Sequence, residues 1–380
     1  MAFDLRMKIA MFGHKRIPSR EGGVEIVAEE LSTRMAAMGH SVTCYNRAGH
    51  HVGGSDFDGE IPSEFRGVKL KTVPTLDKKG LAAVTSSFFA ALMSAVSNAD
   101  VVHIHAEGPG AMSWLPRLFG KRVIVTVHGL DWKRQKWQSG FGARYIRWGE
   151  KMLVRYAHEI IVLSKNVRQY FLDIYGRNTR YIPNGVSRPQ RIPADRIREE
   201  FGIGSRDYLL FLGRLVPEKG VHYLIEAFQK LDTNKKLVIA GSTSDTDAYV
   251  QSLKQTAGTD DRILFTGFVQ GQTLEELYSN AYLYILPSDL EGMPLSLLEA
   301  MSYGNCCVVS DIPECTEVVG DKAAVFPAGD VAALVECLQR LCKDEALAAA
   351  YRAEAADYIC GKYNWDAVTE QTVQIYGERK

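Results

Sequence analysis

The chain has 380 residues, more than the ~250–300 at which one hydrophobic core usually stops growing, so we expect two domains. With 46% hydrophobic and 24% charged residues, its composition is that of an ordinary soluble globular protein. The formal net charge is zero, but residues 1–187 hold 26 basic and 16 acidic side chains, and the remainder holds 19 and 29. A basic half commonly faces an anionic partner or surface.

The seven cysteines show no metal-like pairing, so we expect reduced thiols that mostly serve packing. The N-terminal segment, MAFDLRMKIAMFG, lacks the apolar core of a signal peptide. The uncharged run Leu81–Asn98 is rich in Ser and Ala and barely reaches the ~18–20 residues that a membrane span needs. We therefore expect a buried helix there, in a protein that is cytoplasmic or peripheral on the inner face of the membrane.

Short apolar strands alternate with helical stretches along the first half. Lys8–Phe12 is a predicted strand, followed by a glycine-containing loop and a helix from about Gly23 to Met38, which Gly39 ends. The next predicted strands are Ser41–Tyr45, Val68–Val73, Val101–His105, Arg122–His128 and Glu159–Leu163. This alternation predicts a parallel sheet with helices on both faces.

A segment rich in proline and polar residues, Asn178–Ala194, is the predicted linker. A second set of strands follows it: Tyr208–Leu212, Leu237–Ala240, Arg262–Phe265, Ala281–Leu286 and Cys306–Val309. Two similar doubly wound domains would leave a cleft between the carboxyl-terminal edges of their sheets. Ligands bind at those edges in this architecture.

Two carboxylates, Glu291 and Glu299, flank seven mostly apolar residues in the second half. From Pro294 onward the segment is typical of a helix with proline in its first turn. Glu299 would then lie about one and a half turns along the helix, and Glu291 in the loop before it. Carboxylates at two depths would suit the hexose and ribose hydroxyls of a sugar nucleotide. The alternative is a loop glutamate and a helix glutamate with nothing in common.

The segment Phe211–Gly220 follows a predicted strand and precedes a helix predicted over Val221–Phe228. Its two cations, Arg214 and Lys219, would project over the N-terminal end of that helix, which already favours anions through its free amides. A diphosphate suits such a site without a bound metal. The alternative is a solvated loop with two ordinary basic residues.

The pattern G-R-x4-K-G, then E-x7-E followed by A-M-x-x-G, resembles the retaining glycosyltransferases of family 4, which have the GT-B fold. Features of the first half fit the resemblance in the family's order over essentially the whole chain. They are the Gly22-Gly23 loop, an H-x-H at a strand end (His103, His105), T-V-H-G (Thr126–Gly129) and P-N-G-V (Pro183–Val186). Residues 16–25 further resemble a subgroup of bacterial surface-polysaccharide rhamnosyl- and glucosyltransferases.

The resemblance implies a role for each matching side chain. Arg214 and Lys219 would hold the donor diphosphate. Glu299 would hydrogen-bond the ribose hydroxyls, and Glu291 the hydroxyls of the transferred sugar. His128 would sit beside the anomeric centre. Together the resemblance implies that His128, Arg214, Lys219 and Glu291 carry catalysis.

The resemblance also assigns backbone groups to the donor. Gly23 would bring an amide close to the phosphates, and the base would lie near Thr266-Gly267-Phe268. Pro294 departs from the family, in which many members have glycine, and it removes a possible amide donor. The further donor-binding residues implied by the resemblance are Gly22, Gly23, Gly267, Phe268, Gly292, Met293 and Leu295.

The expected site needs neither a metal nor a cofactor. Fixed cations would stabilise the negative charge that develops on a leaving diphosphate. The histidines His103, His105 and His128 could suggest a metal, but no carboxylate spacing supports one, so satisfied polar histidines are the preferred interpretation. The D-x-D strings at residues 56–58 and 245–247 fall in predicted loops and are short enough to arise by chance.

Aromatic and basic residues are interleaved over Trp132–Tyr156. Phe141, Tyr145, Trp148 and Met152 would share one face of a helix, with cations on a neighbouring face. Such a helix could dock on an anionic membrane, or its aromatic face could simply be core. No nucleic-acid recognition module is visible.

We therefore predict an α/β protein of GT-B fold, with two doubly wound Rossmann-like domains facing across a cleft. Residues 1–187 with a returning C-terminal helix (363–380) would form the acceptor-side domain, and residues 188–362 the nucleotide-sugar domain. The predicted function is retaining transfer of a hexosyl group, favouring a UDP-sugar donor, to a glycan or polyprenyl-linked acceptor in polysaccharide biosynthesis. The alternatives are a GT-B nucleotide-sugar epimerase and a non-catalytic nucleotide-sugar-binding protein.

Overall fold

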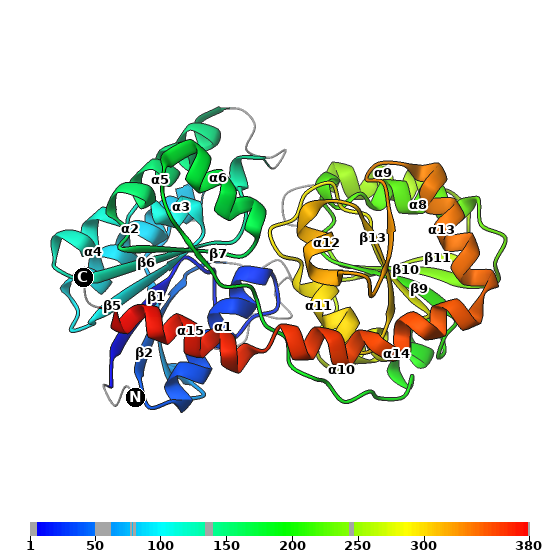
Figure 1. Cartoon of the computed structure of the whole chain (residues 1–380), viewed down its shortest axis with the longest axis horizontal. Coiled ribbons are helices and arrows are strands. Elements are labelled where there is room, and N and C mark those ends of the chain that lie inside the picture. Colours follow the sequence, from blue (N-terminus) through cyan, green and yellow to red (C-terminus); the bar gives the residue numbers. More distant parts are fainter. Residues whose placement is uncertain are drawn as a thin grey trace. The chain divides into compact units, whose positions relative to one another are not determined.

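A computed structural model describes residues 6–49, 62–76, 78, 81–133, 140–242 and 247–378 of the chain. The chain forms two compact units, Met1–Asn184 with Trp365–Lys380 and Gly185–Asn364 (Figure 1). Each unit consists of a parallel sheet covered by helices on both faces, so the predicted pair of Rossmann-like α/β domains is confirmed.

The first unit contains a sheet of strand order β3-β4-β2-β1-β5-β6-β7-β8. All neighbouring strands are parallel except β3, which runs antiparallel to β4. The strands are β1 (Lys8–Phe12), β2 (Ser41–Arg47), β3 (Glu64–Phe65), β4 (Val68–Val73), β5 (Val101–His105), β6 (Arg122–Val127), β7 (Glu159–Val162) and β8 (Arg180–Tyr181).

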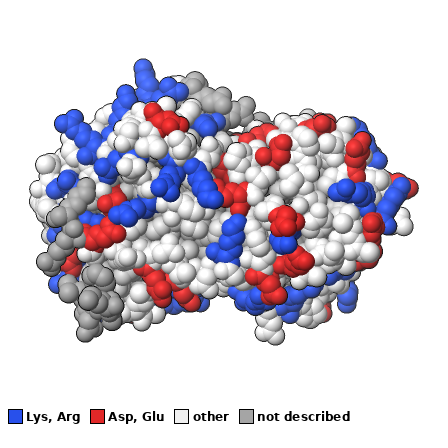
Figure 2. Space-filling model, in the orientation of Figure 1, with Lys and Arg blue, Asp and Glu red and all other residues white. Residues whose placement is uncertain are grey.

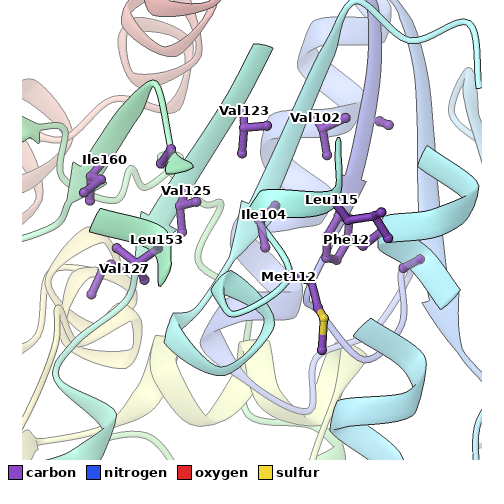
Figure 3. Close-up of a cluster of buried hydrophobic side chains, with 14 of the residues drawn as sticks. Phe12, Val102, Ile104, Met112, Leu115, Val123, Val125, Val127, Leu153 and Ile160 are labelled. Atoms are coloured by element: carbon purple, nitrogen blue, oxygen red, sulfur yellow. The ribbon is translucent and has the colours of Figure 1, made fainter. Parts of the chain in front are cut away.

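Helices connect these strands and bury their apolar sides on the sheet. They are α1 (Gly23–Ala37), α2 (Leu81–Val96), α3 (Glu107–Gly110), α4 (Trp114–Leu118), the 3-10 turn η2 (Asp131–Lys133), α5 (Gly140–Tyr156), α6 (Lys165–Tyr175) and α15 (Trp365–Gly377). Figure 3 shows the core between β1, β5 and β6 and the helices on one face, with Phe12, Ile104 and Val125 among the side chains that meet there. Burial of these apolar groups is the main force that stabilises the sheet. It thereby fixes the position of the sheet edge, where polar side chains lie.

The last helix, α15, belongs to the first unit although it ends the chain. The Tyr376 hydroxyl lies 2.5 Å from His103 Nδ1, and the Arg122 guanidinium donates to the carbonyl of Ile375 at 2.8 Å. Arg34 on α1 pairs with Asp366 at 3.2 Å. These contacts tie α15 to the strands β5 and β6 and to helix α1.

The second unit contains a fully parallel sheet of order β11-β10-β9-β12-β13-β14. Its strands are β9 (Tyr208–Leu212), β10 (Lys236–Ala240), β11 (Ile263–Gly267), β12 (Leu283–Leu286), β13 (Cys306–Ser310) and β14 (Ala324–Phe326). Its helices are α7 (Arg196–Phe201), η4 (Pro217–Lys219), α8 (Val221–Gln229), α9 (Asp247–Ala257), α10 (Gly271–Asn280), α11 (Leu295–Ser302), α12 (Pro313–Val319), α13 (Val331–Lys343) and α14 (Glu345–Lys362).

Two local expectations change, and a third is confirmed. The predicted linker begins too early, because Arg180–Tyr181 within it pairs with β7 as strand β8. Pro294 is not in the first turn of its helix but is the residue before it, with extended backbone, so α11 begins at Leu295. The run from Leu81 forms α2, whose small Ala and Ser residues are buried, as expected. Among the described helices, none is long and apolar enough to cross a membrane.

Candidate functional site

The loop after β9 is held by a close approach that requires glycine. Gly220, which follows η4, has φ +64°, and a Cβ there would lie 2.0 Å from the carbonyl oxygen of Pro287. A side chain would therefore clash with the segment that follows β12, and its backbone conformation would also be strained. This contact brings Lys219 against the loop that carries Glu291.

Lys219 and Glu291 form an ion pair in the second unit. Lys219 Nζ lies 2.5 Å from Glu291 Oε1, and the two side chains are only 14% and 7% exposed. The Ser288 hydroxyl also donates to Glu291 Oε1, at 2.7 Å, and the Ser310 hydroxyl donates to the Ser288 carbonyl, at 2.5 Å. The structure thus brings together two side chains that we expected to contact the diphosphate and the sugar respectively.

Arg214 and Glu299 lie elsewhere at the carboxyl-terminal edge of the sheet of the second unit. Arg214 is exposed two residues after β9. Glu299 lies on α11, one turn into the helix, where its Oε2 accepts a hydrogen bond from the Tyr278 hydroxyl at 3.1 Å. The Tyr278 ring stacks on Tyr303 with centroids 5.3 Å apart. Stacking and the hydrogen bond together restrict the rotamers of Glu299.

The expected backbone contacts lie at strand and helix ends of the second unit. Gly267 ends β11 and its carbonyl accepts from the Gly241 amide at 2.8 Å, while Phe268 follows it half-buried. Gly292 and the buried Met293 follow Glu291, and Leu295 begins α11. Amides in the first turn of a helix have no partner further back in that helix, so this end suits an anion or a hydroxyl oxygen.

On the first unit, Gly22 and Gly23 form the start of α1. Gly22 is the N-cap residue, with extended backbone and no side chain to cap the helix, and Gly23 is the first helical residue. Glu25 in the first turn is buried, and its Oε1 accepts from the Lys15 amide at 2.8 Å. That bond fixes the loop after β1 against the N-terminus of α1.

Three histidines lie at the carboxyl ends of β5 and β6. His103 Nε2 is 2.7 Å from the Thr126 hydroxyl, and His105 Nδ1 is 3.0 Å from His128 Nε2. Burial, followed by the neighbouring His128, lowers the pKa of His103 to about 3, and burial also lowers the pKa of His105 well below its usual value. Both buried rings are therefore neutral at pH 7. His128, the expected catalytic histidine, is held by a neutral ring.

The histidines contact hydroxyls and one another, and among the described residues no group of three or more His, Cys, Asp or Glu could hold a metal ion. The D-x-D string at residues 56–58 lies outside the described residues, as do Asp245 and Thr246 of the second string.

A pair of buried carboxyl groups, Glu107 and Glu150, was missed by sequence reasoning. Glu107 Oε2 accepts from the Asp131 amide at 2.7 Å, and Glu150 Oε1 accepts from Tyr170 at 2.8 Å and from Tyr175. The other oxygen of each, Glu107 Oε1 and Glu150 Oε2, is buried without a conventional partner.

One proton explains both of these oxygens. Burial, then the nearby Asp131 and a hydrogen bond with Glu150, raise the pKa of Glu107 well above its usual value. A proton on Glu107 would let it donate to Glu150, while its Oε2 accepts from the amide of Asp131, in the loop that follows His128. No pattern marks these glutamates in the sequence, because their character comes from burial alone. Ser288 was missed for the same reason.

Helix α5 carries the predicted basic and aromatic residues on the first unit. Tyr145 and Met152 are half-buried, whereas Trp148 is 44% exposed. Four cations are exposed, and the one acid of the helix, Glu150, points inward with 1% exposure. Figure 2 shows Lys and Arg gathered over the part of the first unit where α5 lies. The exposed cations are Arg144, Arg147, Lys151 and Arg155.

Comparisons with known proteins agree with this organisation. Residues 21–188 match the family described as Glycosyltransferase Family 4, and residues 193–358 match the family described as Glycosyl transferases group 1. Among solved structures, sucrose-phosphate synthase from Thermosynechococcus elongatus superimposes with a TM-score of 0.83 at 21% identity, over 98% of both chains. HepE from Anabaena, in complex with UDP and glucose, gives a TM-score of 0.81 at 16% identity, over 97% of this chain and 99% of that one.

Known relatives are similarly distant in sequence. An uncharacterised glycosyltransferase of Methanocaldococcus jannaschii is 26% identical, over 97% of this chain and 98% of its own length. The alpha-D-kanosaminyltransferase of Streptomyces kanamyceticus is 26% identical, over 73% of this chain and 77% of its own length. With two doubly wound domains and both family matches in order, the chain belongs to the family 4 glycosyltransferases of GT-B fold.

Proposed function

We propose that this glycosyltransferase moves a hexosyl group, with retention, from a UDP-sugar to a glycan or lipid-linked glycan in polysaccharide biosynthesis. The observation that supports it most directly is the Lys219–Glu291 pair, a buried cation and carboxylate 2.5 Å apart at the carboxyl-terminal edge of a parallel sheet. UDP is favoured because HepE, which shares the fold, has been solved with UDP and with UDP-glucose.

In the proposed reaction the bond between the anomeric carbon and the β-phosphate oxygen breaks, and a bond to the acceptor oxygen forms on the same face of the sugar. The acceptor proton passes to the departing phosphate oxygen. Positive charge builds on the sugar and negative charge on the leaving diphosphate. Lys219 and Arg214 stabilise the latter, and they act more strongly in the transition state than in the ground state.

Glu291 is proposed to bind sugar hydroxyls and is not proposed as a nucleophile. Its Oε1 is already occupied by Lys219 and Ser288. A carboxylate engaged by a cation and a hydroxyl is a weaker nucleophile, but it remains a good acceptor for the hydroxyls of a sugar. Glu299 is proposed to accept hydrogen bonds from the ribose hydroxyls. The hydrogen bond from the Tyr278 hydroxyl orients the Glu299 carboxylate.

The remaining proposed roles are those that the family resemblance implies. Backbone amides at Gly22 and Gly23 would approach the phosphates, His128 would contact the reacting sugar, and Gly267 and Phe268 would lie near the base. The amides of Gly292, Met293 and Leu295 would assist Glu291. We propose that no metal and no cofactor takes part, since fixed cations can carry the countercharge.

Calorimetric titration with UDP-, GDP- and dTDP-sugars, in the presence of a chelator, tests this proposal. We expect UDP-sugars to bind and the Lys219→Ala variant to lose that binding. Tight binding of GDP- or dTDP-sugars instead would overturn the proposed donor. If binding or turnover vanished with chelator and returned with a divalent cation, the metal-free mechanism would be wrong.

Two alternatives predict different products. An epimerase would convert the nucleotide sugar without an acceptor, and a non-catalytic binding protein would return it unchanged. Incubation with a radiolabelled UDP-hexose and a glycan mixture, followed by chromatography, separates the three. We expect label in a glycan and free UDP in equal amounts. Label that stays on the nucleotide, whether or not its sugar is altered, would contradict transfer.

We also propose that the exposed face of α5 contacts an anionic membrane. Four cations and the partly exposed Trp148 share that face, and the acid of the helix is buried elsewhere. Cations attract anionic headgroups, and tryptophan favours the interface. Flotation with phosphatidylglycerol vesicles at low salt should retain the wild type but not the Arg144→Gln/Lys151→Gln variant. Equal retention of both, or equal binding to neutral vesicles, would reject the contact.

A further inference from the structure

The loop that follows β6 carries His128 and is contacted at two points by one short segment of the chain. At the start of the loop, His128 Nε2 lies 3.0 Å from His105 Nδ1. Three residues later, the Asp131 amide donates to Glu107 Oε2 at 2.7 Å. Because water does not compete inside the protein, such hydrogen bonds restrict the positions of both partners. His105 and Glu107 are two residues apart, so the segment that they bound fixes both points of the loop.

The backbone between His105 and Glu107 is strained. Ala106 has φ +75° and ψ 158°, a combination that is essentially reserved for glycine. Its amide donates to the Thr126 carbonyl at 2.8 Å, which ties the segment to β6. A Cβ at Gly149 would lie 2.6 Å from the Glu107 carbonyl oxygen, so α5 packs directly against the segment. Strain of this kind persists only where the surrounding structure imposes it, and it is concentrated at functional sites.

The Glu107 carboxyl is buried beside a second acid. Glu107 is 0% exposed and Glu150, on α5, is 1% exposed. The Tyr170 and Tyr175 hydroxyls donate to Glu150 Oε1, and Glu107 is hydrogen-bonded to Glu150. Burial of two acids costs more free energy than burial of apolar side chains of similar volume. Packing alone therefore does not explain an acid at position 107.

We propose that Glu107 is a positioning residue for the transfer reaction. Its Oε2 fixes the Asp131 amide and thereby the loop on which His128 meets the reacting sugar. This inference rests on the proposed function, and it adds a residue that acts through His128. A displacement of about 1 Å at a reacting group can lower a rate by about 10²-fold. Most of the proposed donor contacts belong to the second unit, so Glu107 should affect kcat and not donor affinity.

Two substitutions at position 107 test the proposal. Glu107→Leu removes the acceptor for the Asp131 amide and should lower kcat on the order of 10²-fold. Glu107→Gln should keep nearly full kcat, because its amide oxygen can accept from Asp131 while its NH2 group donates to Glu150. Transfer from radiolabelled UDP-glucose to a glycan mixture provides kcat. Calorimetry with UDP-glucose should give the same Kd for both variants and the wild type.

Glu276→Leu is the matched control for a merely structural role. Glu276, on α10 of the second unit, is also 0% exposed and also accepts from a backbone amide, that of Ile197, at 3.0 Å. Its loss should lower the melting temperature and leave kcat of the folded protein unchanged. If Glu107→Leu does not fold, Glu107→Asp replaces it, because a carboxyl shortened by one methylene no longer reaches the Asp131 amide.

Full kcat in Glu107→Leu, or an equal loss in Glu107→Gln, would overturn the proposal. So would a weaker Kd for UDP-glucose that accounts for the lost activity. His128→Ala separates this inference from the proposed function. If UDP-glucose does not bind the wild type, the proposed function is refuted, and full kcat in His128→Ala would refute the role proposed for His128. A large loss in His128→Ala with full kcat in Glu107→Leu would refute only this inference.

Discussion

The candidate sites of the two units differ in the charge state of their buried ionisable groups. In the second unit, Lys219 and Glu291 form an ion pair that is stabilised by Ser288. In the first unit, His103, His105 and Glu107 are buried with no counterion among the described residues, and burial shifts the pKa of each toward its neutral form. The candidate site of the second unit therefore presents fixed charges, which would suit a diphosphate. The candidate site of the first unit presents hydrogen bonds between neutral groups, which suit the positioning of a side chain such as His128.

The largest effect should follow from breaking the charge pair. We predict that Glu291→Gln lowers kcat by about 10²–10³, the magnitude for loss of one preorganised polar contact in a transition state. The substitution also leaves Lys219 without its partner. Steady-state kinetics of transfer provide the measurement, with Glu336→Gln on the exposed side of α13 as a matched control. A loss of less than about three-fold would show that the pair is structural and that the contrast between the units is false.

The close approach that creates the pair can be tested by itself. Gly220→Ala should reduce the free energy of unfolding by about 3 kcal/mol, since a Cβ would lie 2.0 Å from the Pro287 carbonyl oxygen. Gly202→Ala is the matched control. Gly202 has φ +61°, close to the +64° of Gly220, but a Cβ there would meet nothing within 4 Å.

For Gly202→Ala we expect only the cost of the backbone conformation, about 1 kcal/mol. Chemical denaturation measures both variants. Equal destabilisation would mean that backbone conformation, and not contact with Pro287, explains the glycine at position 220.

The raised pKa of Glu107 should make the free energy of unfolding depend on pH. The folded-state pKa of Glu107 lies above its usual value of 4.5. The proton therefore favours the folded state below pH 4.5, and its contribution is lost as pH rises from there through the folded pKa. In Glu107→Gln this dependence should be absent. The stability of the wild type relative to Glu107→Gln should fall by about 1.4 kcal/mol for each unit by which the pKa is raised.

Denaturation of both proteins across pH 4.5–9 measures that difference, and the buried histidines cancel because both proteins contain them. Glu64→Gln, at an exposed glutamate of β3, should run parallel to the wild type. A difference that rises with pH would mean that Glu107 is ionised in the folded protein, and the contrast with the second unit would disappear.

The smallest expected effect concerns the hydrogen bond between Tyr376 and His103. Tyr376→Phe removes the hydroxyl that lies 2.5 Å from His103 Nδ1 and should cost about 1 kcal/mol of stability. Because His103 is neutral, we expect no change in the pH dependence of transfer. Differential scanning calorimetry and a pH–rate profile provide the two measurements, with Tyr351→Phe as the control. A shifted profile would show that His103 titrates during catalysis.

Much of the sheet architecture was predictable, because short apolar strands alternate with helices. The predicted bounds of β1, β4, β5 and β9 agree with the structure residue for residue. The strands β3 and β8 have only two residues each and were missed, because so short a segment has no periodicity. The helix after Pro294 was placed one residue too early for a related reason. Proline fits both the N-cap and the first turn, and only the backbone decides between them.

The two halves of the candidate site were not equally visible. Lys219 and Glu291 stand in spaced motifs, so sequence alone selected both, although it did not indicate that they meet. Glu107 and Glu150 stand in no motif. Their properties come from burial and from neighbours distant in sequence, such as Asp131 for Glu107. A sequence shows which groups can ionise, but only the packing decides which of them stay neutral.

The return of α15 to the first unit has a consequence for the order of folding during synthesis. His103 leaves the ribosome more than 270 residues before Tyr376, its hydrogen-bond partner. The whole second unit is therefore synthesised while the first still lacks its last helix. Domains generally fold as units from the N-terminus onward. Here the N-terminal unit begins to fold first but is completed last, and a ribosome stalled anywhere before residue 365 would hold it unfinished.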